Sequence, residues 1–98
     1  MIELRKTAEF ASWFDGLKDP GSRARVLVRI RRLSLGNPGD AHPVGQGVCE
    51  LRLHFGPGLR IYFMARGAFL VVLLCGGDKS RQARDNRRAI ELSNRVEE

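Results

Sequence analysis

Residues 50–85 read ELRLHFGPGLRIYFMARGAFLVVLLCGGDKSRQARD, and this stretch decides the fold because strand-like runs alternate with tight turns. Residues 50–55 alternate polar and apolar side chains, as a half-buried strand does. Residues 56–58, Gly-Pro-Gly, favour a turn, because glycine accepts positive φ angles and proline fixes its own. Residues 59–65 alternate again, so the sequence predicts a hairpin of two antiparallel strands.

A third strand and a final helix follow this hairpin. Residues 69–75 are apolar on both faces, which predicts an interior strand covered on both sides. The glycines at 76–77 are expected to end it. Residues 78–80 then open a helix that Ser80 can cap and that runs to about Val96. This helix has few apolar members, so we expect it to be loosely docked.

The pleat of a strand sorts the side chains of the hairpin into two faces, because successive residues point to opposite sides. Glu50, Arg52 and His54 share one face, and pairing places Arg60 and Tyr62 across from them. We therefore expect a polar, cationic sheet face with an aromatic hydroxyl. The opposite face is predicted to be core: Leu51, Leu53, Ile61 and Phe63.

The first half of the chain is predicted to be mostly helical. Residues 2–6 form a possible short strand, after which Thr7 is a suitable helix N-cap. Residues 19–20, Asp-Pro, predict the start of a second helix that runs to about Leu35. Residues 36–47 are rich in Gly, Pro, Asn and Asp and are interpreted as a loop. An apolar stripe at helical spacing is expected to bury the first helix: Phe10, Trp13, Phe14 and Leu17.

The predicted element order is β-α-α-β-β-β-α, in one small domain over residues 1–98. Such an order is typical of an α+β fold in which helices pack on one side of a mostly antiparallel sheet.

The charge of the chain favours a polyanionic partner. The formal net charge is +6, the sequence pI is about 10.4, and 14 of the 17 basic residues are arginine. Arginine pairs with phosphate in a bidentate manner and stacks on bases, which suits RNA, DNA or a ribosome. A basic surface that only keeps the protein in solution explains the same composition. Five arginines are candidate RNA or ribosome contacts, or simply solvated helix faces: Arg25, Arg29, Arg32, Arg81 and Arg84.

Other classes of protein fit the sequence less well. Cys49 and Cys75 lie on predicted strands, no secretory signal precedes them, and free cysteines in a reducing cytoplasm are expected. The two cysteines and two histidines lack the spacing of zinc ligands, so no cofactor is predicted. The apolar run 69–75 is too short to span a bilayer, which argues against a membrane partner.

The strings ELRLHFGPGLRIYF and FLVVLLCGGDKSRQARD together resemble the RelE/HigB-type toxins of bacterial type II toxin–antitoxin systems. The similarity is greatest to the addiction-module killer proteins, a subgroup of the RelE/ParE superfamily that is related to a phage-derived family. It implies a RelE-like fold and a ribosome-dependent mRNA endonuclease that inhibits translation. It also implies a cognate antitoxin, often a helix-turn-helix protein, through which operator DNA is contacted indirectly. No metal is needed by such enzymes, in which a ribose 2′-oxygen attacks the adjacent phosphate.

Cleavage of this kind needs a base, cationic stabilisation of the phosphorane and an acid for the leaving oxygen. Arg60 is the main candidate for the phosphate clamp, and the resemblance places the family's strand arginine there. Arg52 is a possible second clamp, and Lys79 a possible phosphate contact or proton donor. Structural pairing, with Glu50 or with Asp78, would explain the same cations.

Three further side chains are candidates for the proton transfers. His54 has a suitable ordinary pKa for a base, although the resemblance does not supply histidine as the usual base. Tyr62 could stack on a nucleobase or donate a proton. Glu50 could act as a base or only orient Arg52.

Two alternative functions remain compatible with the sequence. A ParE-like toxin would bind DNA gyrase without any chemistry, because fold does not determine function. An interaction subunit would act only within an operator-binding toxin–antitoxin complex.

Overall fold

The computed structural model describes residues 2–54 and 56–96, and these form an α+β fold. The fold class predicted from the sequence is confirmed. The elements, in chain order, are β1 (Glu3–Lys6), α1 (Ala8–Asp15), α2 (Pro20–Ser34), β2 (Ala41–Gly45), β3 (Val48–Arg52), β4 (Leu59–Arg66), β5 (Leu70–Asp78), the 3₁₀ turn η1 (Lys79–Arg81) and α3 (Gln82–Ser93).

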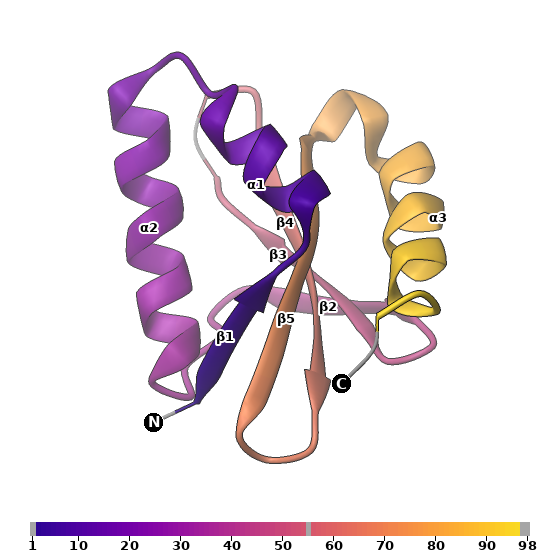
Figure 1. Cartoon of the computed structure of the whole chain (residues 1–98). Coiled ribbons are helices and arrows are strands. Elements are labelled where there is room, and N and C mark those ends of the chain that lie inside the picture. Colours follow the sequence, from indigo (N-terminus) through magenta and orange to yellow (C-terminus); the bar gives the residue numbers. More distant parts are fainter. Residues whose placement is uncertain (1, 55, 97–98) are drawn as a thin grey trace.

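The strands form one mixed sheet in the order β1-β5-β4-β3-β2 (Figure 1). β1 pairs with β5 in parallel, and the other three pairings are antiparallel, so the mostly antiparallel prediction is confirmed. The hairpin of β3 and β4 aligns Glu50 with Tyr62 and Arg52 with Arg60. Arg60 and Tyr62 therefore lie across from Glu50 and Arg52 on one face, as the alternation predicts.

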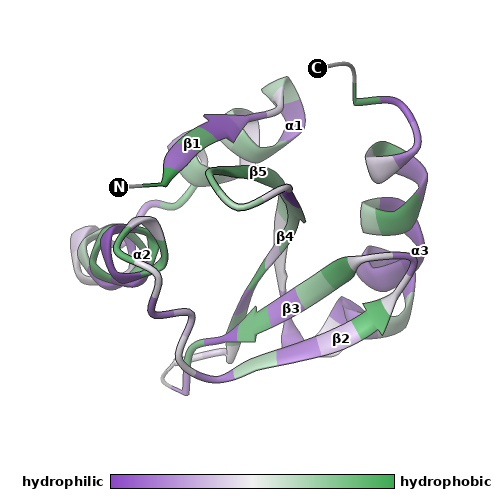
Figure 2. Ribbon diagram, turned by 90° about the horizontal axis from the view of Figure 1, so that it is seen from below, coloured by the Kyte–Doolittle hydropathy of each residue, from purple (hydrophilic) through white to green (hydrophobic). Residues whose placement is uncertain are grey.

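Helices cover both faces of this sheet, which corrects the expectation that they pack on one side. α1 and α2 cover the face that holds the predicted core residues of the hairpin, and Phe10 and Val26 are buried there. α3 covers the other face, where Ala89 and Leu92 pack against Tyr62. Figure 2 shows α2 and α3 on opposite sides of the twisted sheet.

Three local predictions are wrong. Residues 36–47 are not all loop, because they contain the edge strand β2, which pairs with β3. The strand β5 does not end at the two glycines but continues to Asp78. The last helix is not capped by Ser80: the Asp78 carboxylate accepts a hydrogen bond from the Ser80 backbone N–H at 2.9 Å and caps η1.

A β-bulge changes the phase of β5. Tyr62 pairs with Cys75 and Phe63 with Leu73, so Leu74 is the extra residue. Leu74 and Cys75 consequently lie in the same core cluster, on the α3 side, although they are adjacent in the chain.

Beyond the bulge, the strand passes between two helices at very short range. A Cβ atom on Gly76 would lie 2.2 Å from the Trp13 ring of α1. A Cβ atom on Gly77 would lie 1.9 Å from the Asp85 carboxylate of α3. The two glycines thus allow helix side chains to contact the strand backbone from both sides.

We expect Gly76→Ala to lower the free energy of unfolding by about 1–3 kcal/mol, because the added methyl group overlaps a packed indole ring. Urea denaturation followed by circular dichroism measures this change.

Gly21→Ala is the matched control, because its Cβ atom would lie no closer than 3.5 Å to the Asp19 side chain at the start of α2. This variant should be as stable as the wild type or slightly more stable, since alanine favours the helix. Equal stability of Gly76→Ala and Gly21→Ala would contradict the packing described for β5.

Candidate functional site

One buried carboxylate, that of Glu50, connects the polar residues of the β3–β4 hairpin. Its Oε1 atom accepts hydrogen bonds from Arg52 Nε at 2.7 Å and from Arg60 at 3.2 Å. Its Oε2 atom accepts a hydrogen bond from the Tyr62 hydroxyl at 3.0 Å. The amide of Gln82, from the first turn of α3, donates to Oε1 at 3.2 Å. One carboxylate against two guanidinium groups leaves this cluster with one net positive charge.

The polar sheet face that the sequence predicts is present, and part of it is completely buried. The side chains of Glu50 and Tyr62 are 0% exposed, because α3 lies over them. Burial, and then the charge of Glu50, raise the pKa of Tyr62 above its ordinary value. Tyr62 is therefore a neutral donor to Glu50, and in this structure it does not reach a surface on which a nucleobase could stack.

The cationic ends of the cluster open onto a cleft of about 630 Å³. Arg52 and Arg60 line it from the sheet, and Lys79 and Gln82 line it from the start of η1 and α3. His54, which follows β3, also lines the cleft. Four of the six predicted catalytic residues thus meet at one cleft, while the other two, Glu50 and Tyr62, lie beneath it.

The turn of the hairpin brings Lys79 close to this cleft. Gly58 has a φ of +76°, and a Cβ atom there would lie 3.2 Å from the Lys79 Cβ. Glycine suits this position for two reasons: it adopts the left-handed backbone conformation without strain, and its lack of a Cβ atom leaves room for Lys79.

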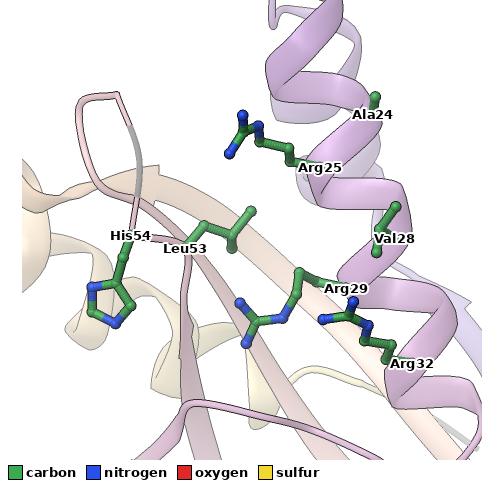
Figure 3. Close-up of a pocket in the computed structure, with 7 residues that line it drawn as sticks. All are labelled: Ala24, Arg25, Val28, Arg29, Arg32, Leu53 and His54. Carbon is green, nitrogen blue, oxygen red and sulfur yellow. The ribbon is translucent and has the colours of Figure 1, made fainter.

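A second groove, of about 350 Å³, adjoins the cleft and shares Leu53 and His54 with it. Arg25, Arg29 and Arg32 line it from α2, and Arg25 and Arg29 point toward the segment that carries His54 (Figure 3). Arg29 also has a structural role, because it donates to the Arg52 carbonyl oxygen at 3.0 Å. The predicted arginine row of α2 is thus joined to the cleft through His54.

The two remaining arginine candidates lie beyond Lys79. Arg81 ends η1, and Arg84 is an exposed residue of α3 whose Nε lies 3.7 Å from Asp85 Oδ1. Desolvation by burial raises the pKa of Asp85, whose Oδ2 atom has no hydrogen-bond partner among the residues that the structure describes.

Within residues 2–54 and 56–96, no cluster of three or more His, Cys, Asp or Glu side chains could hold a metal ion. In the same part of the chain, none of the helices has the length and apolar character needed to cross a membrane. Cys49 and Cys75 are free.

Two residues of this region were missed by the sequence reasoning. Gln82 contacts Glu50 across 32 positions of the chain, and the sequence signal for it is its place three residues after Lys79, within the string that carries the family resemblance. Asp40, in the segment before β2, hydrogen-bonds through Oδ2 to His54 and through Oδ1 to His42. No local pattern predicts the contact between Asp40 and His54.

We expect Glu50→Gln to lower the free energy of unfolding by about 3 kcal/mol or more, because it leaves two hydrogen-bonded guanidinium groups without their carboxylate. Urea denaturation measures the change.

The matched control is Glu3→Gln, which removes a carboxylate from an exposed pair with Arg5. Its effect should stay within about 0.5 kcal/mol. A Glu50→Gln variant no less stable than this control would show that the cluster does not stabilise the fold.

Two comparisons with known proteins identify the family of this chain. Residues 12–96 match the family model described as "Phage derived protein Gp49-like (DUF891)". The chain is also 43% identical, over 88 residues, to an uncharacterized protein of Haemophilus influenzae, and the match covers 90% of this chain and 89% of that protein. The chain therefore belongs to the Gp49-like family of phage-derived proteins, a family of the addiction-module toxin type.

Proposed function

We propose that this protein is the toxin of a type II toxin–antitoxin pair and that it cleaves mRNA on the bacterial ribosome. The observation that carries this proposal is the meeting of Arg52, Arg60, Lys79 and His54 at one cleft. Three of these side chains are cationic, and the fourth is suited to proton transfer at neutral pH. Together they supply the groups that cleavage of RNA by its own 2′-oxygen requires.

The phosphate is bound by the arginine pair in this proposal. Glu50 holds Arg52 and Arg60 through hydrogen bonds of 2.7 and 3.2 Å, so both guanidinium groups are fixed before substrate arrives. A preorganised cation stabilises the extra negative charge of a phosphorane without the cost of reorientation. Glu50 therefore acts as an orienting group, and its complete burial removes it from contact with the 2′-hydroxyl.

His54 and Lys79 carry the proton transfers. His54 takes the proton of the 2′-hydroxyl, and the freed oxygen electron pair forms a bond to phosphorus. The bond from phosphorus to the 5′-oxygen breaks, and Lys79 protonates that leaving oxygen. Both side chains then exchange protons with water, which leaves a cyclic phosphate and a 5′-hydroxyl as products.

The rest of the RNA is expected to follow the neighbouring arginines. The α2 groove with Arg25, Arg29 and Arg32 adjoins the cleft, and Arg81 and Arg84 follow Lys79 along η1 and α3. These residues suit the RNA phosphate backbone or ribosomal RNA, because their contacts need no base sequence. A cognate antitoxin, of the helix-turn-helix type, would neutralise the toxin by covering this basic surface and would link it to operator DNA.

We expect expression of the wild-type chain without antitoxin to create new mRNA 5′ ends inside translated frames. Arg60→Ala should reduce these ends by about 10²-fold or more, because one charge-stabilising donor is lost. Mapping of 5′ ends after induction measures both effects.

Arg5→Ala is the matched control, because Arg5 lies on β1, away from the cleft, and should leave the ends unchanged. Lys79→Ala tests the same cleft with an exposed residue, in case Arg60→Ala fails to fold. Growth arrest without new ends would contradict the nuclease and favour a gyrase-binding toxin, and induction without arrest or ends would favour an interaction subunit.

A further inference from the structure

Asp40 lies between two histidines at the edge of the candidate site. Its Oδ2 atom is hydrogen-bonded to Nε2 of His54, and its Oδ1 atom lies 2.5 Å from Nε2 of His42. His54 in turn lines both the cleft and the α2 groove. The carboxylate thus contacts the side chain at which the two surfaces meet.

Backbone interactions hold Asp40 in this position. The Arg52 N–H donates to the Asp40 carbonyl oxygen at 3.0 Å, and the next residue, Ala41, pairs with Leu51 in the sheet. Gly39, with a φ of +71°, lies so close to Arg29 that a Cβ atom there would be 2.8 Å from the guanidinium. The edge strand β2 and the α2 helix therefore fix where the carboxylate sits relative to the end of β3.

The chemistry of a carboxylate determines which nitrogen of His54 carries the hydrogen. Hydrogen bonds from His54 and then His42 lower the pKa of Asp40, so this carboxyl is ionised at neutral pH. An ionised carboxylate can only accept hydrogen bonds, which requires a hydrogen on Nε2 of His54. In a neutral imidazole the lone pair is then on Nδ1.

We propose that Asp40 is a positioning residue that holds His54 in the Nε2–H tautomer, with Nδ1 as the atom that takes the 2′-hydroxyl proton. The role rests on the proposed nuclease function. When the 2′-O–H bond breaks, the proton passes to Nδ1 and the oxygen electron pair goes to phosphorus. The imidazolium formed at that moment stays hydrogen-bonded to the negative Asp40, which stabilises it.

The tautomer can be measured directly by long-range ¹⁵N–¹H correlation NMR of the free protein. At about pH 8, where an ordinary histidine is neutral, the wild type should show a protonated Nε2 and an unprotonated Nδ1 on His54. Asp40→Asn should move both ring ¹⁵N resonances of His54 from their wild-type positions, because an amide can also donate to Nε2. Asp15→Asn, the same change at the end of α1, should leave them in place. A protonated Nδ1 in the wild type, or identical spectra for wild type and Asp40→Asn, would overturn the inference.

A double-mutant cycle tests the catalytic consequence, with single-turnover cleavage of a translated mRNA on purified ribosomes as the readout. Asp40→Asn should slow cleavage at least about tenfold when His54 is present, because the wrong tautomer is populated. In a His54→Ala background the same change should alter the rate by less than about twofold, since the two residues act as one unit. Equal effects in both backgrounds would show that Asp40 acts only through the fold.

Different results would exclude the role of Asp40 and the nuclease activity itself. Full cleavage by His54→Ala overturns the role of Asp40, yet leaves the nuclease intact. A wild-type chain that cuts no mRNA overturns the nuclease and, with it, the catalytic role of Asp40.

Discussion

The buried carboxylate of Glu50 is the interaction on which the other polar groups of the site depend. It joins two strands to the last helix, since its four hydrogen-bond partners come from β3, β4 and α3. A carboxylate without water around it is costly unless paired, and here two guanidinium groups, a phenol and an amide satisfy it. The same contacts that satisfy Glu50 also immobilise the arginines at the wall of the cleft. One cluster therefore joins the sheet to α3 and orders the wall of the cleft.

The sheet can bury such a cluster because helices enclose it on both faces. α1 and α3 approach the end of β5 from opposite sides at Gly76 and Gly77. The Glu9 carboxylate of α1 also accepts hydrogen bonds from Arg88 of α3, at 2.9 and 3.0 Å from Arg88 Nε. The two helices thus contact each other as well as the strand between them. This closure keeps water from Tyr62 and from the carboxylate to which it donates.

Much of this architecture follows from sequence pattern. The alternation in residues 50–65 predicts the hairpin and its apolar face, because successive side chains of a strand point to opposite faces and only one of these faces is apolar here. What covers the polar face is not encoded in that alternation. The weak hydrophobicity of α3 predicts loose docking, yet Ala89 and Leu92 are buried in the core cluster on this face. The alternation of polar and apolar residues indicates which face of the sheet a side chain lies on, but it does not indicate how deeply that side chain is buried.

The features that the sequence did not predict depend on contacts between distant residues. The edge strand β2 contains Pro43 and Gly45, which disfavour strands, and it forms because β3 offers it hydrogen bonds. Its formation in turn places Asp40 beside His54, 14 positions away in the chain. The cleft itself combines the ends of β3 and β4 with η1, so no single segment describes it.

The bulge at Leu74 is a place where β5 can lose one residue without turning its later side chains to the opposite face. Removal of one residue from a strand normally moves every later side chain to the opposite face. Here the extra residue is already unpaired, so loss of Leu74 would join Leu73 to Cys75 in regular pleat. Gly76 would still face Trp13, and Gly77 would still face Asp85. Leu74 is thus the position at which β5 could lose one residue during evolution while α1 and α3 kept their contacts with the strand.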